Sequence, residues 1–148
     1  MATNDGDLTA DYEIWKRQLK SAMASVMAKE VADAVKEHLT QSVDKRVYAA
    51  YTPENYKRRG ANGGLADTDN YESHVASDEN TITLTVSNET GGNPDGRFYI
   101  TDVIENGSGH NWNGKVPARP FMEEGLQDGL DDGTLEAALI AGVNKRGF

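Results

Sequence analysis

An uninterrupted, helix-compatible stretch at residues 9–46 constrains the fold more than any other feature of the sequence. It contains neither proline nor glycine and is rich in alanine, lysine, glutamate and methionine, which favour helix. Thr9 or Asp11 can cap its start. We therefore predict one long helix over residues 9–46, after a flexible tail at 1–8. Its apolar residues recur at helical spacing: first Tyr12, Trp15, Leu19, Met23 and Val26, then Met27, Val31, Val35, Leu39 and Val43.

This predicted helix is longer than the body that would cover it. A helix of about 38 residues spans about 57 Å, whereas a compact chain of this size is about 40 Å across. Apolar residues at every fourth position also drift around an α-helix by about 40° per step, so no single flat surface covers them all. One end is expected to overhang with an apolar stripe that needs a partner, unless the stretch forms two shorter helices folded into a monomer.

The charge and composition of the chain limit the classes of function. The net charge is −9 and the sequence pI is about 4.7, which argues against binding nucleic acid over the whole surface, because that binding depends on Lys and Arg. The absence of cysteine excludes a disulfide framework and a thiolate metal site. The polar N-terminus and the lack of a long apolar run favour a protein assembled in the cytoplasm, without signal peptide or membrane span.

The middle of the chain is predicted to form a small antiparallel sheet. In residues 81–87, large aliphatic residues alternate with threonine and serine, which is typical of a strand with one wet face. Residues 98–105 are predicted to pair with it across a turn at 89–96, forming a central hairpin. Residues 65–77 contain a weaker strand.

Two prolines, Pro117 and Pro120, flank Arg119 ahead of a predicted C-terminal helix. Pro120 fits the first helical position, where its missing N–H costs nothing. Arg119 is held extended because it precedes a proline. Phe121 and Met122 then begin the apolar face that anchors the helix, so the segment is interpreted as a stiff arm feeding a helix.

Small residues recur at every fourth position of this C-terminal segment, and they allow two interpretations. A continuous helix would present them on one face for close approach to another backbone, offsetting about 1 kcal/mol for each glycine. Alternatively, residues 131–134 break the segment into two helices, with Thr134 as the second N-cap. The small residues are Gly125, Gly129, Gly133, Ala137 and Ala141.

The fold class that these segments predict is α+β, with a long N-terminal helix, a small antiparallel sheet and a C-terminal helix. We expect a single domain after the tail. Its parts are the long helix at 9–46, a connector at 47–64, the sheet and loops at 65–118 including a flexible loop at 107–114, and a C-terminal helix or helix pair at 119–146.

The sequence contains no recognisable catalytic, cofactor-binding or metal-binding motif. Histidines 38, 74 and 110 lack the spacing of metal ligands, and neither a phosphate-binding loop nor a nucleophile elbow occurs. We therefore predict a protein that is not an enzyme and needs no cofactor. A carboxylate-dependent hydrolase is the less favoured alternative, and its candidate loop acids are Asp67, Asp69, Glu72, Asp78 and Glu79.

An aromatic and basic segment at residues 48–59 supports another alternative. Aromatic side chains interleaved with basic ones are typical of sites that contact single-stranded nucleic acid. The simpler interpretation is that the tyrosines pack at the edge of the core while the basic groups pair with the acidic surplus. The residues concerned are Tyr48, Tyr51, Tyr56, Lys57, Arg58 and Arg59.

Two stretches together carry a resemblance to a known family. The first reads Tyr-x-x-Tyr-x-Pro-x-x-Tyr-x-Arg-Arg with Gly-Leu-x-Asp close behind, at residues 48–67. The second is Ile-Glu-Asn-Gly at 104–107 followed by Pro-Ala-Arg-Pro-Phe-Met at 117–122. From about residue 45 onward, the chain resembles the tail-completion, or head–tail joining, proteins of long-tailed bacteriophages.

This resemblance implies a structural virion protein with a small antiparallel sheet flanked by helices. Such proteins form a homo-oligomeric ring, commonly a hexamer, at the phage neck or the head-proximal end of the tail, and DNA passes through it. The implied partners are other copies, a head-completion or stopper protein, a tail terminator or tail tube, and transiently the DNA. The hypothesised interface residues are Arg119, Pro120, Phe121, Met122, Tyr56, Arg58 and Arg59.

Overall fold

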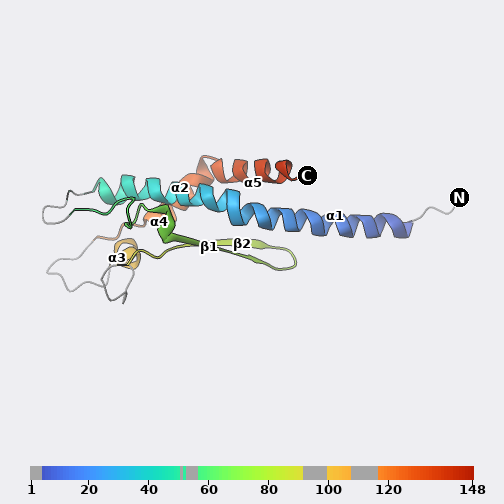
Figure 1. The fold of residues 1–148 in the computed structure, drawn as a ribbon, viewed down its shortest axis with the longest axis horizontal. Helices are drawn as coiled ribbons and strands as arrows, with labels where there is room; N and C mark the ends of the chain where they lie inside the picture. Colours follow the sequence, from blue (N-terminus) through green and yellow to red (C-terminus); the bar gives the residue numbers. More distant parts are fainter. Residues whose placement is uncertain (1–4, 51, 53–56, 92–99, 108–116) are drawn as a thin grey trace.

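The computed structural model describes residues 5–50, 52, 57–91, 100–107 and 117–148. Within these residues the α+β prediction is confirmed: a long N-terminal helix precedes a two-stranded antiparallel sheet and C-terminal helices (Figure 1). Tyr51, Tyr56 and most of the predicted turn at 89–96 and loop at 107–114 lie outside the described residues.

The N-terminal helix is continuous from Asp5 to Tyr48. Its parts are α1 (Asp5–Val26), the π-helical segment η1 (Met27–Val31), α2 (Ala32–Ser42) and the π-helical segment η2 (Val43–Tyr48). The predicted helix at 9–46 is confirmed and extends further at both ends. Residues 5–8, predicted to belong to a flexible tail, are helical instead; Asp5 and Asp7 favour a helix start because negative charge is stabilised in the first turn.

The two π-helical segments keep the apolar positions of this helix against the body. Six buried positions follow one another at steps of four or five residues: Val26, Val31, Val35, Leu39, Val43 and Val47. In a purely α-helical rod each step of four would drift by about 40°. The i→i+5 bonding of a π segment places more residues in each turn, which offsets that drift. The body therefore covers all six positions, Val26 to Leu39 in one core cluster and Val43 and Val47 in a second, in agreement with the prediction that no single flat surface would cover them.

The sheet consists of β1 (Tyr71–Ser77) and β2 (Ile82–Asn88), which pair antiparallel from Tyr71↔Asn88 to Ser77↔Ile82. The strand predicted at 81–87 and the weaker strand within 65–77 are both present. Asp78 closes the turn between them, since its carboxylate accepts hydrogen bonds from the backbone N–H groups of Asn80 (3.0 Å) and Thr81 (2.9 Å).

The predicted strand at 98–105 is wrong, and with it the hairpin to residues 81–87. Residues Ile100–Asn106 form a helix, α3, and β2 pairs with β1 instead. The β-branched residues of this segment favoured a strand, but Ile100 and Ile104 are four residues apart and both pack against the core cluster around Phe121. Helical spacing and tertiary packing outweigh strand propensity here.

The C-terminal segment forms two helices, α4 (Phe121–Asp131) and α5 (Thr134–Lys145). The break is at Gly133, whose φ of 74° is in the left-handed region that glycine adopts readily. The two-helix alternative is thus confirmed, but the N-cap residue is Gly133 and not Thr134. Pro120 likewise precedes α4 as its N-cap and is not its first helical residue.

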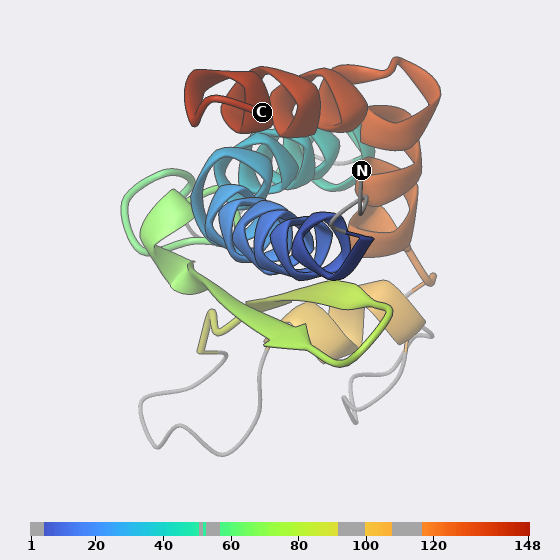
Figure 2. The same ribbon diagram turned by 90° about the vertical axis from the view of Figure 1, so that its right-hand side faces the viewer.

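Of the small residues that recur at every fourth position, only Gly125 and Gly129 of α4 lie against the long helix. Ala137 and Ala141 of α5 are exposed, so the face of small residues predicted for a continuous helix does not form. Cβ atoms built on Gly125 and Gly129 would lie 2.9 Å from Ser42 Cβ and from His38 Cδ2 of α2, respectively. Viewed along the long helix, α5 covers one side, α4 a second and the sheet a third (Figure 2). The long helix is therefore the central element on which all other elements pack.

Candidate functional site: an apolar groove beside an overhanging helix

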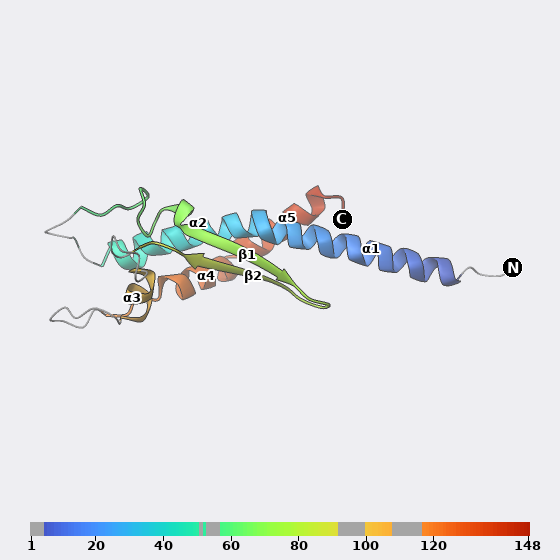
Figure 3. The same ribbon diagram turned by 60° about the horizontal axis from the view of Figure 1, so that its bottom comes forward.

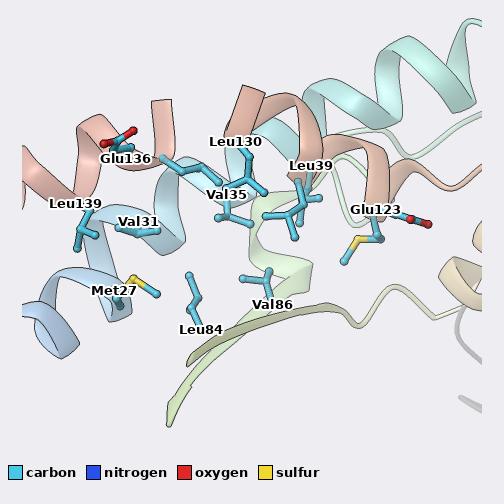
Figure 4. Close-up of a pocket in the computed structure, with 13 residues that line it drawn as sticks. Met27, Val31, Val35, Leu39, Leu84, Val86, Glu123, Leu130, Glu136 and Leu139 are labelled. Atoms are coloured by element: carbon cyan, nitrogen blue, oxygen red, sulfur yellow. The ribbon is translucent and has the colours of Figure 1, made fainter. Parts of the chain in front are cut away.

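An open apolar groove lies between β2 and the two C-terminal helices. Its volume is about 520 Å³. Figure 4 shows the side chains of β2 facing those of α4 and α5 across it, with residues of η1 and α2 between them. The apolar lining residues are Met27, Val31, Val35, Leu39, Leu84, Val86, Met122, Leu126, Leu130, Leu135 and Leu139.

The groove has almost no polar groups that could orient a small polar ligand. Among the described residues that line it, the charged ones are Glu123 and Glu136, whose carboxylates lie at its edges (Figure 4). Leu126 and Leu130 are 42% and 56% exposed, which is unusual for leucines beside a core. Ligand pockets usually combine apolar walls with a few convergent polar groups. This surface is better suited to an apolar side-chain face of another polypeptide.

The N-terminal part of α1 extends beyond the body, as the helix length predicted. Figures 1 and 3 show it continuing past both the β1–β2 turn and the C-terminus. We call residues 8–18, all of them exposed, the overhang. Lys20 marks where the body begins, because its ammonium group donates to the backbone carbonyls of Asp78 and Glu79 in the β1–β2 turn.

The overhang carries an apolar stripe. Leu8, Tyr12 and Trp15 are 71%, 56% and 49% exposed and follow one another at helical spacing. Trp15 contacts Tyr12 and Phe148, with ring centroids 6.2 Å and 6.5 Å away. Large exposed aromatic and aliphatic side chains in a row mark an interaction surface.

The segment around Arg119 is fixed to the chain's own α3. Its backbone N–H donates to Ile104 O at 2.8 Å, and Phe121 N–H donates back to Arg119 O at 2.7 Å. Pro120 lies between them with φ −73° and ψ 63°, which is an inverse γ-turn. Pro120 therefore makes a tight turn between Arg119 and α4.

Glu105 of α3 completes the start of α4. Its carboxylate accepts hydrogen bonds from the N–H groups of Met122 (3.0 Å) and Glu123 (3.2 Å), satisfying donors that a helix start leaves without partners. Phe121 is fully buried between the long helix and Leu65. It anchors α4 in the core, as predicted, while the interface role of residues 119–122 stays a prediction.

Several side chains of the predicted aromatic and basic segment make contacts within the chain itself. The guanidinium of Arg58 lies 4.8 Å from the ring centroid of Tyr48 and donates to Tyr48 O at 2.9 Å. Arg59 donates to Gly91 O at 2.9 Å. Burial raises the pKa of the Tyr48 hydroxyl. These contacts agree with the interpretation that this segment packs at the edge of the core.

The candidate loop acids support turns. Asp67 accepts hydrogen bonds from the N–H groups of Gly63 (2.6 Å) and Asp69 (3.0 Å), and Asp78 closes the β1–β2 turn. Among the described residues, no three His, Asp or Glu side chains form a group that could hold a metal ion. His38 lies 3.5 Å from Asp132, and His74 is exposed on β1; His110 lies outside the described residues.

Ion pairs fix α4 and α5 to the long helix. Arg46 of η2 binds Asp128 through both terminal nitrogens, at 2.8 and 3.0 Å, and also contacts Glu124. The hydrogen bond from Arg46 lowers the pKa of Asp128. Arg146 bonds Glu30 at 2.9 and 3.2 Å and lowers the pKa of that carboxyl by the same cause. These ion pairs therefore hold α4 and α5, which form one side of the groove, against the long helix at its base.

The sequence alone predicted the overhang but not the groove. The overhang follows from one local property, the length of an unbroken helix. The groove requires side chains from η1, α2, β2, α4 and α5 to meet, which local patterns do not specify. The signal for it in the sequence was the pair Leu126 and Leu130, which lies about 100° around α4 from the face that Gly125 and Gly129 pack against the long helix.

The chain matches a known protein family. The family model YomN matches residues 11–145, almost the whole chain. Neither the curated proteins nor the solved structures include a match. In the described part of the chain, no helix combines the length and apolar character required to cross a membrane.

Proposed function

Because this chain belongs to the YomN family, which is phage-derived, we propose that it is a structural virion protein. In this proposal it forms a homo-oligomeric ring at the phage neck or the head-proximal end of the tail. The ring joins head to tail and leaves a channel for DNA. The resemblance of residues 48–67 and 104–122 to tail-completion proteins supports this place in the particle and a hexameric ring.

The observation that carries the proposal is the overhang. Its exposed apolar stripe contributes little to the fold of a single chain and gains stability only when another molecule covers it. A rigid helix that projects from a small body can reach a neighbour at fixed geometry. Repeated contacts between unlike surfaces of identical subunits close into rings when the rotation between subunits permits.

The net charge of −9 is compatible with a DNA channel. Negative charge facing the lumen would keep DNA from adhering during passage, because binding without basic residues releases no counterions. A protein that grips nucleic acid through residues 48–59 has less support, since Arg58 and Tyr48 already contact each other. A hydrolase has less support for a similar reason, since Asp67 and Asp78 bind turn amides.

Deletion of the gene from the phage tests the proposed function. We expect filled heads and separate tails by electron microscopy, with joined particles restored by the wild-type gene supplied in trans. Purified wild-type particles should contain the protein. Infectious, joined particles formed at normal yield without it would contradict the proposal.

A further inference from the structure

We propose that the overhang of one copy docks in the apolar groove of the next copy, so that each chain both donates a helix and receives one. This inference rests on the proposed function, because it supplies the contact between neighbouring subunits of the ring. The two surfaces are unlike, so the contact is heterologous and can repeat from copy to copy.

The continuity of the long helix keeps the overhang out of its own groove. The overhang and the floor of the groove belong to the same rod, which runs without a break from Asp5 to Tyr48. To enter its own groove the overhang would have to fold back, which would break this helix near Val26 and expose buried valines. A second copy can present its overhang without any such change.

The shape and chemistry of the two surfaces match. The groove runs between β2 and α4–α5 beside the long helix (Figure 4), so a helix lying in it would add one more helix to those around the rod. The stripe of Leu8, Tyr12 and Trp15 supplies large apolar side chains for walls lined by Leu126 and Leu130. Aromatic anchors in apolar grooves carry much of the energy of helix recognition.

The charge of the overhang suits the groove better than that of an acidic helix would. Residues 121–136, which span α4 and the start of α5, contain six acidic residues and no lysine or arginine. Two of the acidic residues, Glu123 and Glu136, line the groove itself. In the overhang, Lys16 and Arg17 balance Asp11 and Glu13, so the overhang is formally neutral. A neutral helix meets less repulsion at this groove than an acidic one, which favours the overhang over an acidic helix as the occupant.

Mixing two defective variants tests this contact. The overhang variant is Leu8→Glu with Tyr12→Glu, and the groove variant is Leu126→Glu with Leu130→Glu. Each should weaken self-association by about 30-fold or more, because a charge replaces an apolar anchor. Mixed at equal amounts, they keep one intact overhang and one intact groove, so native mass spectrometry should show a 1:1 dimer and nothing larger.

The control variant is Ile140→Glu, which changes a residue of α5 that is 52% exposed and does not line the groove. It should self-associate like the wild type. All five substituted positions are at least 42% exposed, so circular dichroism and thermal unfolding should show that every variant folds. If the groove pair does not fold, Leu130→Glu alone replaces it.

Three outcomes would overturn the inference. The first is that the groove variant self-associates like the wild type, which would indicate pairing between overhangs. The second is that the two variants fail to combine when mixed. The third is that the wild type stays monomeric at a concentration of about 1 mM, where even a contact worth about 4 kcal/mol would be half occupied. These results concern only the contact between copies. The proposed function is tested separately by the gene deletion, so failure of this inference can be told apart from failure of the proposed function.

Discussion

At the scale of single residues, glycines set the distance between the C-terminal helices and the long helix. A Cβ atom on Gly142 would lie 2.4 Å from Val26 Cγ1, and one on Gly125 would lie 2.9 Å from Ser42 Cβ. Real Cβ atoms do not approach other atoms this closely. The glycines thus lower the helix propensity of α4 and α5, but they allow both helices to pack directly on the long helix.

The substitution Gly142→Ala distinguishes helix propensity from packing, because the two predict opposite changes in the free energy of unfolding. Helix propensity alone predicts a gain of about 1 kcal/mol, whereas overpacking against Val26 predicts a loss of about 1–3 kcal/mol. We expect a loss, measured by urea unfolding. Val26→Ala makes room for the added methyl group, so the double variant should be more stable than the sum of the two single changes predicts. A stabilised Gly142→Ala would contradict this account.

The ion pair between Arg46 and Asp128 predicts how stability depends on pH. Arg46 holds the pKa of Asp128 below its ordinary value of 3.8 in the folded chain. A lowered folded pKa stabilises the fold at pH values above the unfolded pKa, and this contribution disappears as the pH falls through the folded pKa. The free energy of unfolding should therefore decrease on acidification below about pH 5.

Asp128→Asn tests this assignment because it cannot ionise. The variant should be less stable than the wild type at pH 7, and the difference should shrink as the pH approaches 3. Arg46→Gln should produce a similar pH dependence, and the double variant should lose less than the sum of the two changes, since both remove one interaction. A difference from wild type that stays constant between pH 7 and pH 3 would be inconsistent with the ion pair.

At the scale of elements, α3 serves as the N-terminal cap of α4. Glu105 reaches both Met122 and Glu123 amides, and Ile104 O accepts from Arg119. Two helices separated by residues outside the described ranges are joined by these three hydrogen bonds. This arrangement explains Pro120, because the turn at this residue sets the angle between α3 and α4.

Glu105→Ala should destabilise the chain by about 1 kcal/mol, the usual cost of losing a helix cap. Hydrogen exchange at the Met122 and Glu123 amides should become faster, while exchange in α5 remains as in the wild type. Glu105→Gln keeps an acceptor and loses the charge that favours a helix start, so it should fall between wild type and alanine. Unchanged exchange at both amides in the alanine variant would show that α4 has no need of this cap.

The elements that the sequence predicted correctly are those with strong local patterns. The long helix follows from an unbroken run of helix-forming residues, and β2 follows from strict alternation at residues 82–88. The prediction for residues 98–105 was wrong because their β-branched residues are consistent with a strand. In the structure, the core contacts of Ile100 and Ile104 favour a helix instead. The groove between β2 and α4 could not be predicted, because its existence depends on how distant elements pack.

At the scale of the whole molecule, the chain has two unlike surfaces that a solitary copy leaves uncovered. The overhang projects at one end of the rod, and the groove opens along the body (Figures 1 and 4). Surfaces of this kind in one rigid chain lead to head-to-tail assembly, which closes as a ring or continues as a filament. The proposed place in the phage particle requires the ring.

Photo-crosslinking inside assembled particles tests the central claim most directly. A benzophenone amino acid in place of Tyr12 puts the reactive group on the overhang, and particles made from a mixture of ¹⁴N-labelled and ¹⁵N-labelled chains distinguish contacts between copies from contacts within one. We predict mixed-isotope crosslinks from position 12 to residues 122–139 of a second copy. Crosslinks found only within single chains, or only to other virion proteins, would contradict it.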